Sequence, residues 1–268
     1  MKLAVSNIAW PAEQLDQHLR ILSDEGIDGM ELSPSMIWKD PTTIPDAEIV
    51  KLKDHVKSYN LLIPSMHSLT YPRPDFEIYG SEYKRNEIKD YIYKLGIMAN
   101  IMECPIMVFG SGSLRKSKGM DKELCIRILT DFFQSVADRL MELNVMLLIE
   151  PLSRQYTDII NTSTDGMDLV KKVNHAFFGL HIDLKSTFDE NEDQELLWKS
   201  YSQDIRHCHV SNPEMEPPDE TFSYHKKVAG SMRKYGYKNF VSIEMKKKKD
   251  DTADVLKKSA RYLKSVYG

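Results

Sequence analysis

Short apolar runs alternate with longer amphipathic stretches along the whole chain. A run of four to eight apolar residues between turn signals is typical of a buried strand. The sequence predicts eight strands, at Leu3–Ile8, Gly29–Leu32, Leu61–Ser65, Ile106–Phe109, Met146–Ile149, Gly179–Ile182, His207–Val210 and Phe240–Ile243. Strands that alternate with helices indicate a parallel sheet whose strands are joined by right-handed crossovers.

The stretches between the strands carry apolar residues at three- and four-residue spacing, which predicts amphipathic helices. In the first stretch, AEQLDQHLRILSDEG, the side chains of Leu15, Leu19 and Leu22 would share one helix face. Gly26 follows that helix where a C-terminal cap is expected. Asp121 precedes another helical stretch, KELCIRILTDFFQSVADRLMELN, as a candidate N-cap.

Eight strand–helix units favour an α/β fold in which the sheet closes into a (β/α)₈ TIM barrel, rather than an open doubly wound sheet. The chain has 268 residues, and a barrel of this type uses about 250 residues as one domain. We therefore expect residues 1–268 to form a single barrel domain. The first predicted strand is not followed by a GxGxxG or Walker motif, which argues against a nucleotide-binding sheet.

Charge and cysteine content narrow the class of protein further. The net charge is −4, which gives no sign of a nucleic-acid or membrane partner at the level of the whole chain. The apolar runs are too short for a membrane span, and the first one is too short for a signal peptide. Three cysteines without CxxC spacing are expected to be reduced thiols. These features predict a cytoplasmic protein.

The apolar run before Glu150 passes directly into that carboxylate and then into Pro151, which cannot donate to a sheet ladder. A barrel explains this position, because the active sites of such barrels lie at the C-terminal ends of the strands. The next three predicted strands also end on ligand-type residues, at Asp183, His209 and Glu244. The separations of 33, 26 and 35 residues match the roughly 31 residues of one strand–helix unit. Four adjacent strands would therefore present these groups at one rim.

These four groups should point into the barrel, because side chains along a strand alternate between its two faces. Their neighbours should point outward to the helices: Ile149, Ile182, Cys208 and Ile243. Three carboxylates close together raise one another's pKa, and a divalent cation would remove that conflict. Three oxygen ligands and one imidazole suit Mn²⁺, Mg²⁺, Co²⁺ or Zn²⁺. We therefore predict one divalent metal ion held by the four groups.

Five further residues near the predicted strand ends are candidate substrate contacts: Trp10, His67, Arg154, Lys185 and His225. Plainer roles compete with this one, namely packing for the tryptophan, loop hydrogen bonds for His67 and solvation for the two cations. His181 and His207 each lie two residues before a predicted ligand, so they share the inward face one layer deeper. We expect them to be hydrogen-bonded core histidines. The run Lys246–Lys249 either steers an anionic substrate or is simply solvated.

The motifs IEPLSR, HIDLKS, HCHVSN and SIEM, in this order, resemble those of the xylose-isomerase-like TIM barrels. The likeness covers the whole chain and includes GMELSP on the second predicted strand and PSMHSL on the third. This group contains ketose 3-epimerases, hydroxypyruvate isomerases, inosose dehydratases and, more distantly, apurinic endonuclease IV. The resemblance implies a small carbohydrate substrate. A homo-oligomer is compatible with it, because such barrels often form dimers or tetramers.

In the sugar epimerases the matching Glu, Asp, His and Glu bind one divalent metal, and the two glutamates are the acid/base pair on opposite sides of the reacting carbon. Carried over, the resemblance makes Glu150 and Glu244 the catalytic residues of a metal-dependent isomerase or epimerase. A metal that chelates the carbonyl and a neighbouring hydroxyl stabilises the enediolate, and a positioned carboxylate moves the proton.

The substrate-binding positions depart from the ketose epimerases. Ser186 replaces a histidine, Tyr156 a second glutamate and Met215 an arginine. These changes argue against an epimerase of free ketohexoses. Two alternatives stay open: a dehydratase of a polyhydroxylated ketone such as an inosose, and a non-catalytic sugar-binding barrel. Endonuclease IV is disfavoured because its three-metal cluster needs further histidines; His67 and His225 could supply two, but the motif VFGSG after the fourth strand supplies none.

Overall fold

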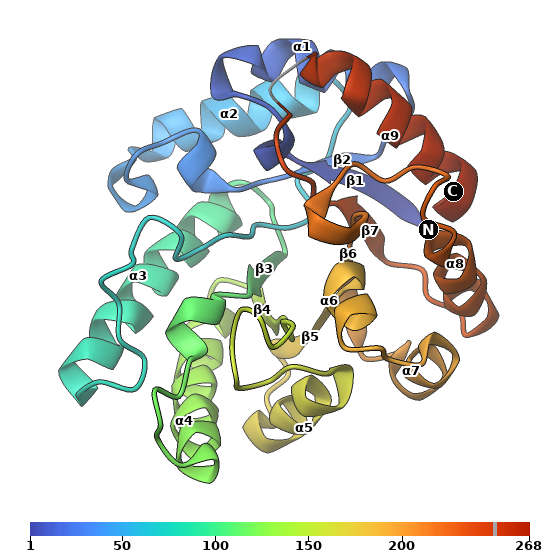
Figure 1. Cartoon of the computed structure of the whole chain (residues 1–268). Coiled ribbons are helices and arrows are strands. Elements are labelled where there is room, and N and C mark those ends of the chain that lie inside the picture. Colours follow the sequence, from blue (N-terminus) through green and yellow to red (C-terminus); the bar gives the residue numbers. More distant parts are fainter. Residues whose placement is uncertain (249–250) are drawn as a thin grey trace.

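The computed structural model describes residues 1–248 and 251–268, and it shows a curled parallel sheet surrounded by helices (Figure 1). Within these residues the sheet has seven strands: β1 (Lys2–Ser6), β2 (Gly29–Glu31), β3 (Ile106–Phe109), β4 (Met146–Ile149), β5 (Phe178–Asp183), β6 (Ile205–Val210) and β7 (Phe240–Ile243). The order in the sheet is β2-β1-β7-β6-β5-β4-β3, and every pairing is parallel. The predicted α/β barrel architecture is confirmed.

The third predicted strand, Leu61–Ser65, is wrong as a regular strand. The segment nevertheless lies between β2 and β3, because Leu62 forms an isolated parallel bridge to β2 and Met66 forms one to β3. Pro64 lacks an amide hydrogen, so a continuous ladder through this segment is not available. An eighth backbone segment therefore closes the barrel without being a strand. The other seven predicted strands are confirmed to within two residues at each end.

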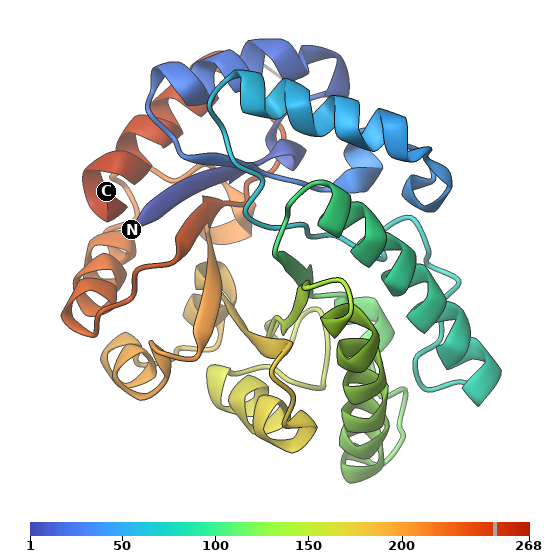
Figure 2. The same ribbon diagram turned by 180° about the vertical axis from the view of Figure 1, so that it is seen from behind.

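Helices cover the outside of the sheet on all sides, as the two opposite views show (Figures 1 and 2). They are α1 (Leu15–Asp24), α2 (Asp46–Ser58), α3 (Glu82–Ile101), α4 (Lys122–Met141), α5 (Ser163–Val173), α6 (Leu184–Asp189), α7 (Gln194–Tyr201), α8 (Tyr224–Lys234) and α9 (Thr252–Tyr267). Both predicted caps are confirmed: Gly26 has φ +69° after α1, and Asp121 Oδ1 accepts the Leu124 amide at 2.9 Å. None of the helices in the described part of the chain is long and apolar enough to cross a membrane.

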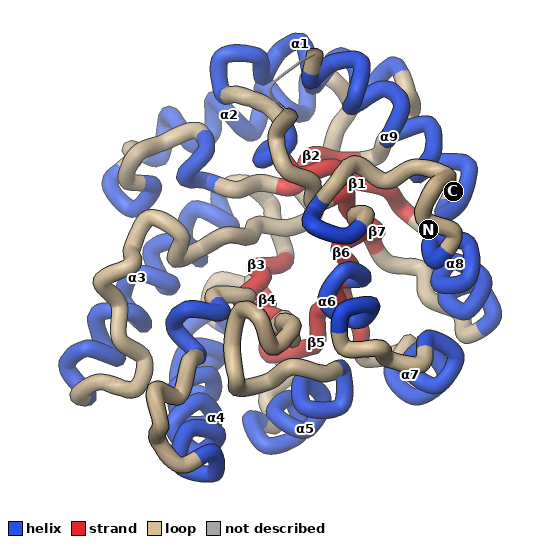
Figure 3. The backbone as a smooth tube through the Cα atoms, viewed as in Figure 1, coloured by secondary structure: helices blue, strands red, loops and turns tan. Residues whose placement is uncertain are grey.

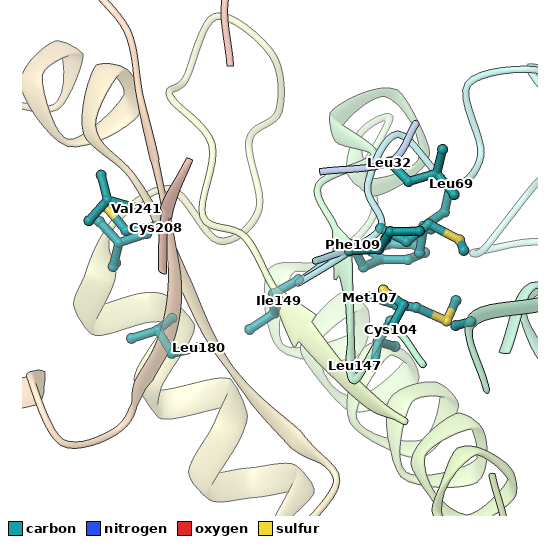
Figure 4. Close-up of a cluster of buried hydrophobic side chains, with 14 of the residues drawn as sticks. Leu32, Leu69, Cys104, Met107, Phe109, Leu147, Ile149, Leu180, Cys208 and Val241 are labelled. Atoms are coloured by element: carbon teal, nitrogen blue, oxygen red, sulfur yellow. The ribbon is translucent and has the colours of Figure 1, made fainter. Parts of the chain in front are cut away.

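The apolar core lies between the outer face of the sheet and the helices. Figure 4 shows part of it, where Leu180, Cys208 and Val241 come from the neighbouring strands β5, β6 and β7. The four residues predicted to point outward are all buried members of this core: Ile149, Ile182, Cys208 and Ile243. The three cysteines are buried and free, as expected. Packing on the outer face thus leaves the alternate side chains of each strand for the barrel interior.

An irregularity between β5 and β6 determines how His181 and Asp183 are paired in the sheet. The register of β5 against β6 shifts just before His181, so that Arg206 is an extra residue on β6 and lies exposed. After the shift, His181 pairs with His207, and Asp183 pairs with His209. Bulges of this kind are frequent next to active sites, where they redirect side chains. The long connections that follow the strands lie over the C-terminal end of the barrel (Figure 3).

Candidate active site

A cavity of about 640 Å³ lies at the C-terminal end of the barrel. This volume falls within the range of about 300 to 1,000 Å³ that is usual for small-molecule sites. Three of the predicted metal ligands, the carboxylates at the ends of β4, β5 and β7, line the cavity. Apolar and aromatic side chains from the surrounding loops form part of its wall: Leu152, Tyr156 and Met215. The cavity is therefore acidic at the strand ends and less polar above them.

The four predicted ligands converge at this cavity. The Nδ1 atom of His209 lies 3.2 Å from Glu244 Oε2 and 3.4 Å from Glu150 Oε1. Asp183 pairs with His209 in the sheet and lines the same cavity as Glu150 and Glu244. Burial, followed by the charges of these two glutamates, raises the pKa of Asp183 to about 7. Glu150 is only 7% exposed and Asp183 only 6%. The structure thus brings together the residues that the sequence singled out.

The donor set of this cluster fits a divalent cation. His209 Nε2 lies 3.0 Å from both carboxylate oxygens of Glu31, which requires a proton on Nε2. Its Nδ1 atom is buried and makes no hydrogen bond to the residues that the structure describes, although Glu150 and Glu244 lie beside it. An imidazole whose other nitrogen donates to a carboxylate is the usual arrangement of a metal-ligating histidine. Burial lowers the pKa of His209, but Glu31 and Glu244 together raise it well above the usual value, so this position attracts positive charge.

Glu31 is the central residue that the sequence analysis missed. It ends β2 and is fully buried. Besides His209, it accepts hydrogen bonds from Ser65 Oγ at 2.8 Å and from Ser242 Oγ at 2.7 Å. Burial raises its pKa, but the charges of the surrounding histidines, His209 first, hold the pKa well below its usual value. The signal was present in the motif GMELSP, where a carboxylate ends a strand just as Glu150 does.

His67 lies where the sequence suggested, next to the cluster and in the cavity lining. Its Nδ1 atom is 3.1 Å from Glu244 Oε1, and its Nε2 atom is 2.6 Å from Ser6 Oγ. Burial raises the pKa of Glu244, but His209 and His67 lower it below its usual value overall. Glu244 is therefore held as a carboxylate between two imidazoles.

Lys185 also lines the cavity, as predicted for a substrate contact. Its Nζ atom donates to Tyr156 Oη at 3.1 Å and to Asp189 Oδ2 at 2.6 Å. Burial lowers the pKa of Lys185, but these two hydrogen bonds outweigh it and raise the pKa above the usual value. A cation and a phenol thus occupy this part of the cavity wall.

Three predicted substrate contacts lie away from the cavity lining. Arg154 is exposed and forms an ion pair with Glu190. Trp10 is buried and stacks on the imidazole of His18, with ring centroids 4.9 Å apart. His225 is buried in α8, and both of its nitrogens have hydrogen-bond partners inside the core. These positions do not support a role in substrate binding, because each side chain is directed to solvent or to packing instead.

The basic run Lys246–Lys249 does not reach the cavity within its described residues. Lys246 and Lys247 are exposed, and Lys248 pairs with Glu216. Lys249 lies outside the described residues. The solvated alternative therefore fits the described lysines better than the steering one.

Two residues without any sequence signal position the end of β4. Arg115 is fully buried, and its guanidinium donates to the backbone carbonyls of Glu150 at 2.8 Å and of Gly110 at 2.9 Å. Burial lowers the pKa of Arg115 to about 10, so it stays charged at neutral pH. Gly110 lies against the Glu150 carboxylate, since a Cβ atom added there would be 2.3 Å from Glu150 Oε2.

We expect Gly110→Ala to weaken divalent-metal binding about tenfold, because the added methyl group displaces the Glu150 carboxylate. Calorimetric titration with Mn²⁺ or Zn²⁺ measures the effect. Gly230→Ala in α8 is the matched control, because no atom of the described part of the chain lies within 4 Å of a Cβ there. The control should keep its metal affinity and gain about 0.5–1 kcal/mol of stability. Equal metal affinity in both variants would contradict the close approach of Gly110 to Glu150.

Comparisons with known proteins agree with this architecture. The family model described as "Xylose isomerase-like TIM barrel" matches residues 19–266. No curated protein matches this sequence significantly. A structure of D-psicose 3-epimerase with D-tagatose, from Clostridium cellulolyticum H10, is similar with a TM-score of 0.85 at 15% identity, covering 100% of this chain and 99% of that one.

Two other solved structures are similar over nearly their full length. The 3-keto-D-glucoside 4-epimerase YcjR from E. coli gives a TM-score of 0.84 at 15% identity, with 99% of both chains covered. The IOLI protein with a bound zinc atom gives a TM-score of 0.77 at 16% identity, covering 100% of this chain and 98% of that one. At such low identities the likeness shows a shared fold.

Proposed function

Because the chain belongs to the xylose isomerase-like TIM barrel family, we propose that it is a divalent-metal-dependent isomerase or epimerase of a sugar or sugar derivative. One observation supports this most strongly. Glu150 and Glu244 flank the free nitrogen of His209 at 3.4 and 3.2 Å, inside a cavity of substrate size. Two carboxylates on either side of one centre suit a reaction that removes a proton from carbon and returns it elsewhere.

The ion would be Mn²⁺, Mg²⁺, Co²⁺ or Zn²⁺, held by the side chains of Glu150, Asp183, His209 and Glu244. When bound, it supplies positive charge that stabilises the negative charge developing on the substrate oxygens. The buried carboxylate of Glu31 fixes the His209 ring so that Nδ1 faces the cluster. The protein thus orients the ligands before any ion binds.

The two glutamates would carry the proton transfer. One removes the proton next to the substrate carbonyl, and the other returns a proton to the same carbon or to its neighbour. His67 contributes by holding Glu244 in one orientation through the 3.1 Å contact. Arg115 does the same for the backbone of Glu150. Burial of the cluster excludes water, which strengthens each of these interactions.

The cavity wall favours a sugar derivative over a free ketohexose. Tyr156 and Met215 stand where the ketose epimerases carry a glutamate and an arginine, and Leu152 adds to the apolar surface. Lys185 and Tyr156 offer polar atoms to one side of the substrate. A substrate with an apolar or ring-shaped part beside its ketose would fit this wall better than a small polyhydroxylated chain.

Incubation with a divalent metal and a panel of ketoses, ketose phosphates and ketoglycosides in D₂O tests the proposal. NMR should show deuterium next to the carbonyl in a product that is an isomer of the substrate. Loss of water would point instead to a dehydratase. A protein that binds metal and sugar without any deuterium exchange would contradict an enzymatic role and favour a sugar-binding barrel.

A further inference from the structure

Two further histidines lie beneath the four predicted metal ligands. His181 and His207 are fully buried and hydrogen-bonded to each other through their Nδ1 atoms at 3.3 Å, as expected for core histidines. The ring centroid of His181 is 4.2 Å from that of His209. One ring nitrogen from each of these three histidines lies within 4.8 Å of the other two. His181 is therefore close enough to the predicted metal ligands to act with them.

A chain of hydrogen bonds fixes the protons of this pair. Ser65 has a single hydroxyl hydrogen and donates it to Glu31 at 2.8 Å, because a carboxylate only accepts. Ser65 must then accept from His207 Nε2, which lies 2.8 Å away. A neutral imidazole carries only one hydrogen, and in His207 that hydrogen is on Nε2, so Nδ1 is the acceptor. That nitrogen accepts from His181 Nδ1, and His181 Nε2 is left as a free lone pair.

The free nitrogen of His181 is aimed at the site. His181 Nε2 is buried, has no hydrogen-bond partner within residues 1–248 and 251–268, and lies 3.5 Å from Glu150 Oε1. His209 Nδ1 lies 3.4 Å from the same oxygen. A metal ion displaces any proton from the His209 Nδ1 atom, and then two ring nitrogens and a carboxylate oxygen face one another at a point where a cation would join them. Two atoms that bind one zinc ion at about 2.1 Å are roughly 3.0–3.6 Å apart, which is the spacing found here.

We propose that His181 is a further ligand of the divalent ion, so that the site offers two imidazoles rather than one. This inference rests on the metal site of the proposed function. Imidazole suits Zn²⁺ and Co²⁺, whereas carboxylate and water suit Mg²⁺ and Mn²⁺. The second imidazole therefore makes Zn²⁺ or Co²⁺ the preferred ion.

Glu31 is hydrogen-bonded to His209 directly and to His181 through two intermediate side chains. It accepts directly from His209 Nε2, and it orients His181 through Ser65 and His207. The Glu31 carboxylate thus determines which ring nitrogen of His181 and of His209 faces the metal site. Outer groups of this kind raise ligand basicity and fix ring orientation.

X-ray absorption of the zinc-loaded wild-type protein tests the inference without any mutation. The zinc spectrum should show scattering from two imidazoles per ion. One imidazole per ion would overturn the role of His181 and leave the metal site of the proposed function intact. Absence of stoichiometric zinc binding would overturn both.

Zinc affinity of a variant gives a second readout. His181→Phe keeps a ring but removes the lone pair, and it should raise the Kd for Zn²⁺ about 100-fold while changing the Kd for Mn²⁺ much less. His225→Phe is the matched control, because His225 is also a fully buried histidine but lies outside the cavity lining. The control should leave both Kd values unchanged. Unaltered zinc affinity in His181→Phe would overturn the inference.

Discussion

Replacing Glu150 or Glu244 by glutamine is expected to lower kcat/KM for the substrate by about 10³-fold or more. Each change removes a carboxylate that can take up a proton, and general acid–base catalysis alone contributes roughly 10² to 10⁴. Each also removes one proposed ligand from the ion, so metal affinity should fall as well. Both carboxylates lie within 3.4 Å of His209 Nδ1, so a carboxylate outside the cluster is too far away to replace either of them. Steady-state kinetics at saturating metal separates the catalytic loss from the binding loss.

Glu190→Gln is the matched control for these two variants. The side chain of Glu190 is only 4% exposed, but it pairs with Arg154 outside the cavity lining. Its kcat/KM should stay within about twofold of the wild type, as for most changes away from a site. Substantial turnover by either Glu150→Gln or Glu244→Gln would mean that the proton transfer does not use this pair.

Glu31→Gln is expected to reduce both stability and metal affinity. The glutamate is fully buried and accepts hydrogen bonds from Ser65, Ser242 and His209. An amide has only one acceptor oxygen, so at least one of these donors would face the NH₂ group. Breaking a buried charged network of this kind costs about 3 kcal/mol. Loss of the group that orients a metal-ligating histidine should weaken metal binding about 10- to 100-fold.

Denaturant unfolding and calorimetric metal titration measure these two effects. Ser242→Ala provides a graded control, since it removes a single hydrogen bond to Glu31 and should cost about 1 kcal/mol with little change in metal affinity. A Glu31→Gln protein as stable as the wild type, with the same metal affinity, would show that Glu31 does not organise the cluster.

Much of the fold and of the central cluster could be predicted from the sequence, because one physical rule links them. Parallel barrel strands present their C-terminal ends at one rim, so regular spacing of strand-end ligands predicts convergence. The same rule applied to β2 would have found Glu31. The apolar character of Leu61–Ser65 could not show that this segment forms isolated bridges and no regular strand. Pro64 was the available signal against a regular strand there.

The surrounding residues were harder to predict, because nearness to a strand end does not fix the direction of a loop side chain. Arg154 follows β4 by five residues and turns to solvent, whereas Lys185 follows β5 by two and lines the cavity. His225 lies in α8, where its ring packs into the core. Arg115 gave no signal at all, since its role depends on backbone carbonyls that lie 35 and 44 residues away from it in the sequence.

The most direct test of the account is anomalous X-ray diffraction from crystals of the protein soaked in Mn²⁺, Co²⁺ or Zn²⁺, measured on both sides of the metal absorption edge. The account predicts a single strong peak within bonding distance of carboxylate oxygens of Glu150, Asp183 and Glu244 and of Nδ1 of His209. A strong peak elsewhere, with none between these four side chains at saturating metal, would contradict it.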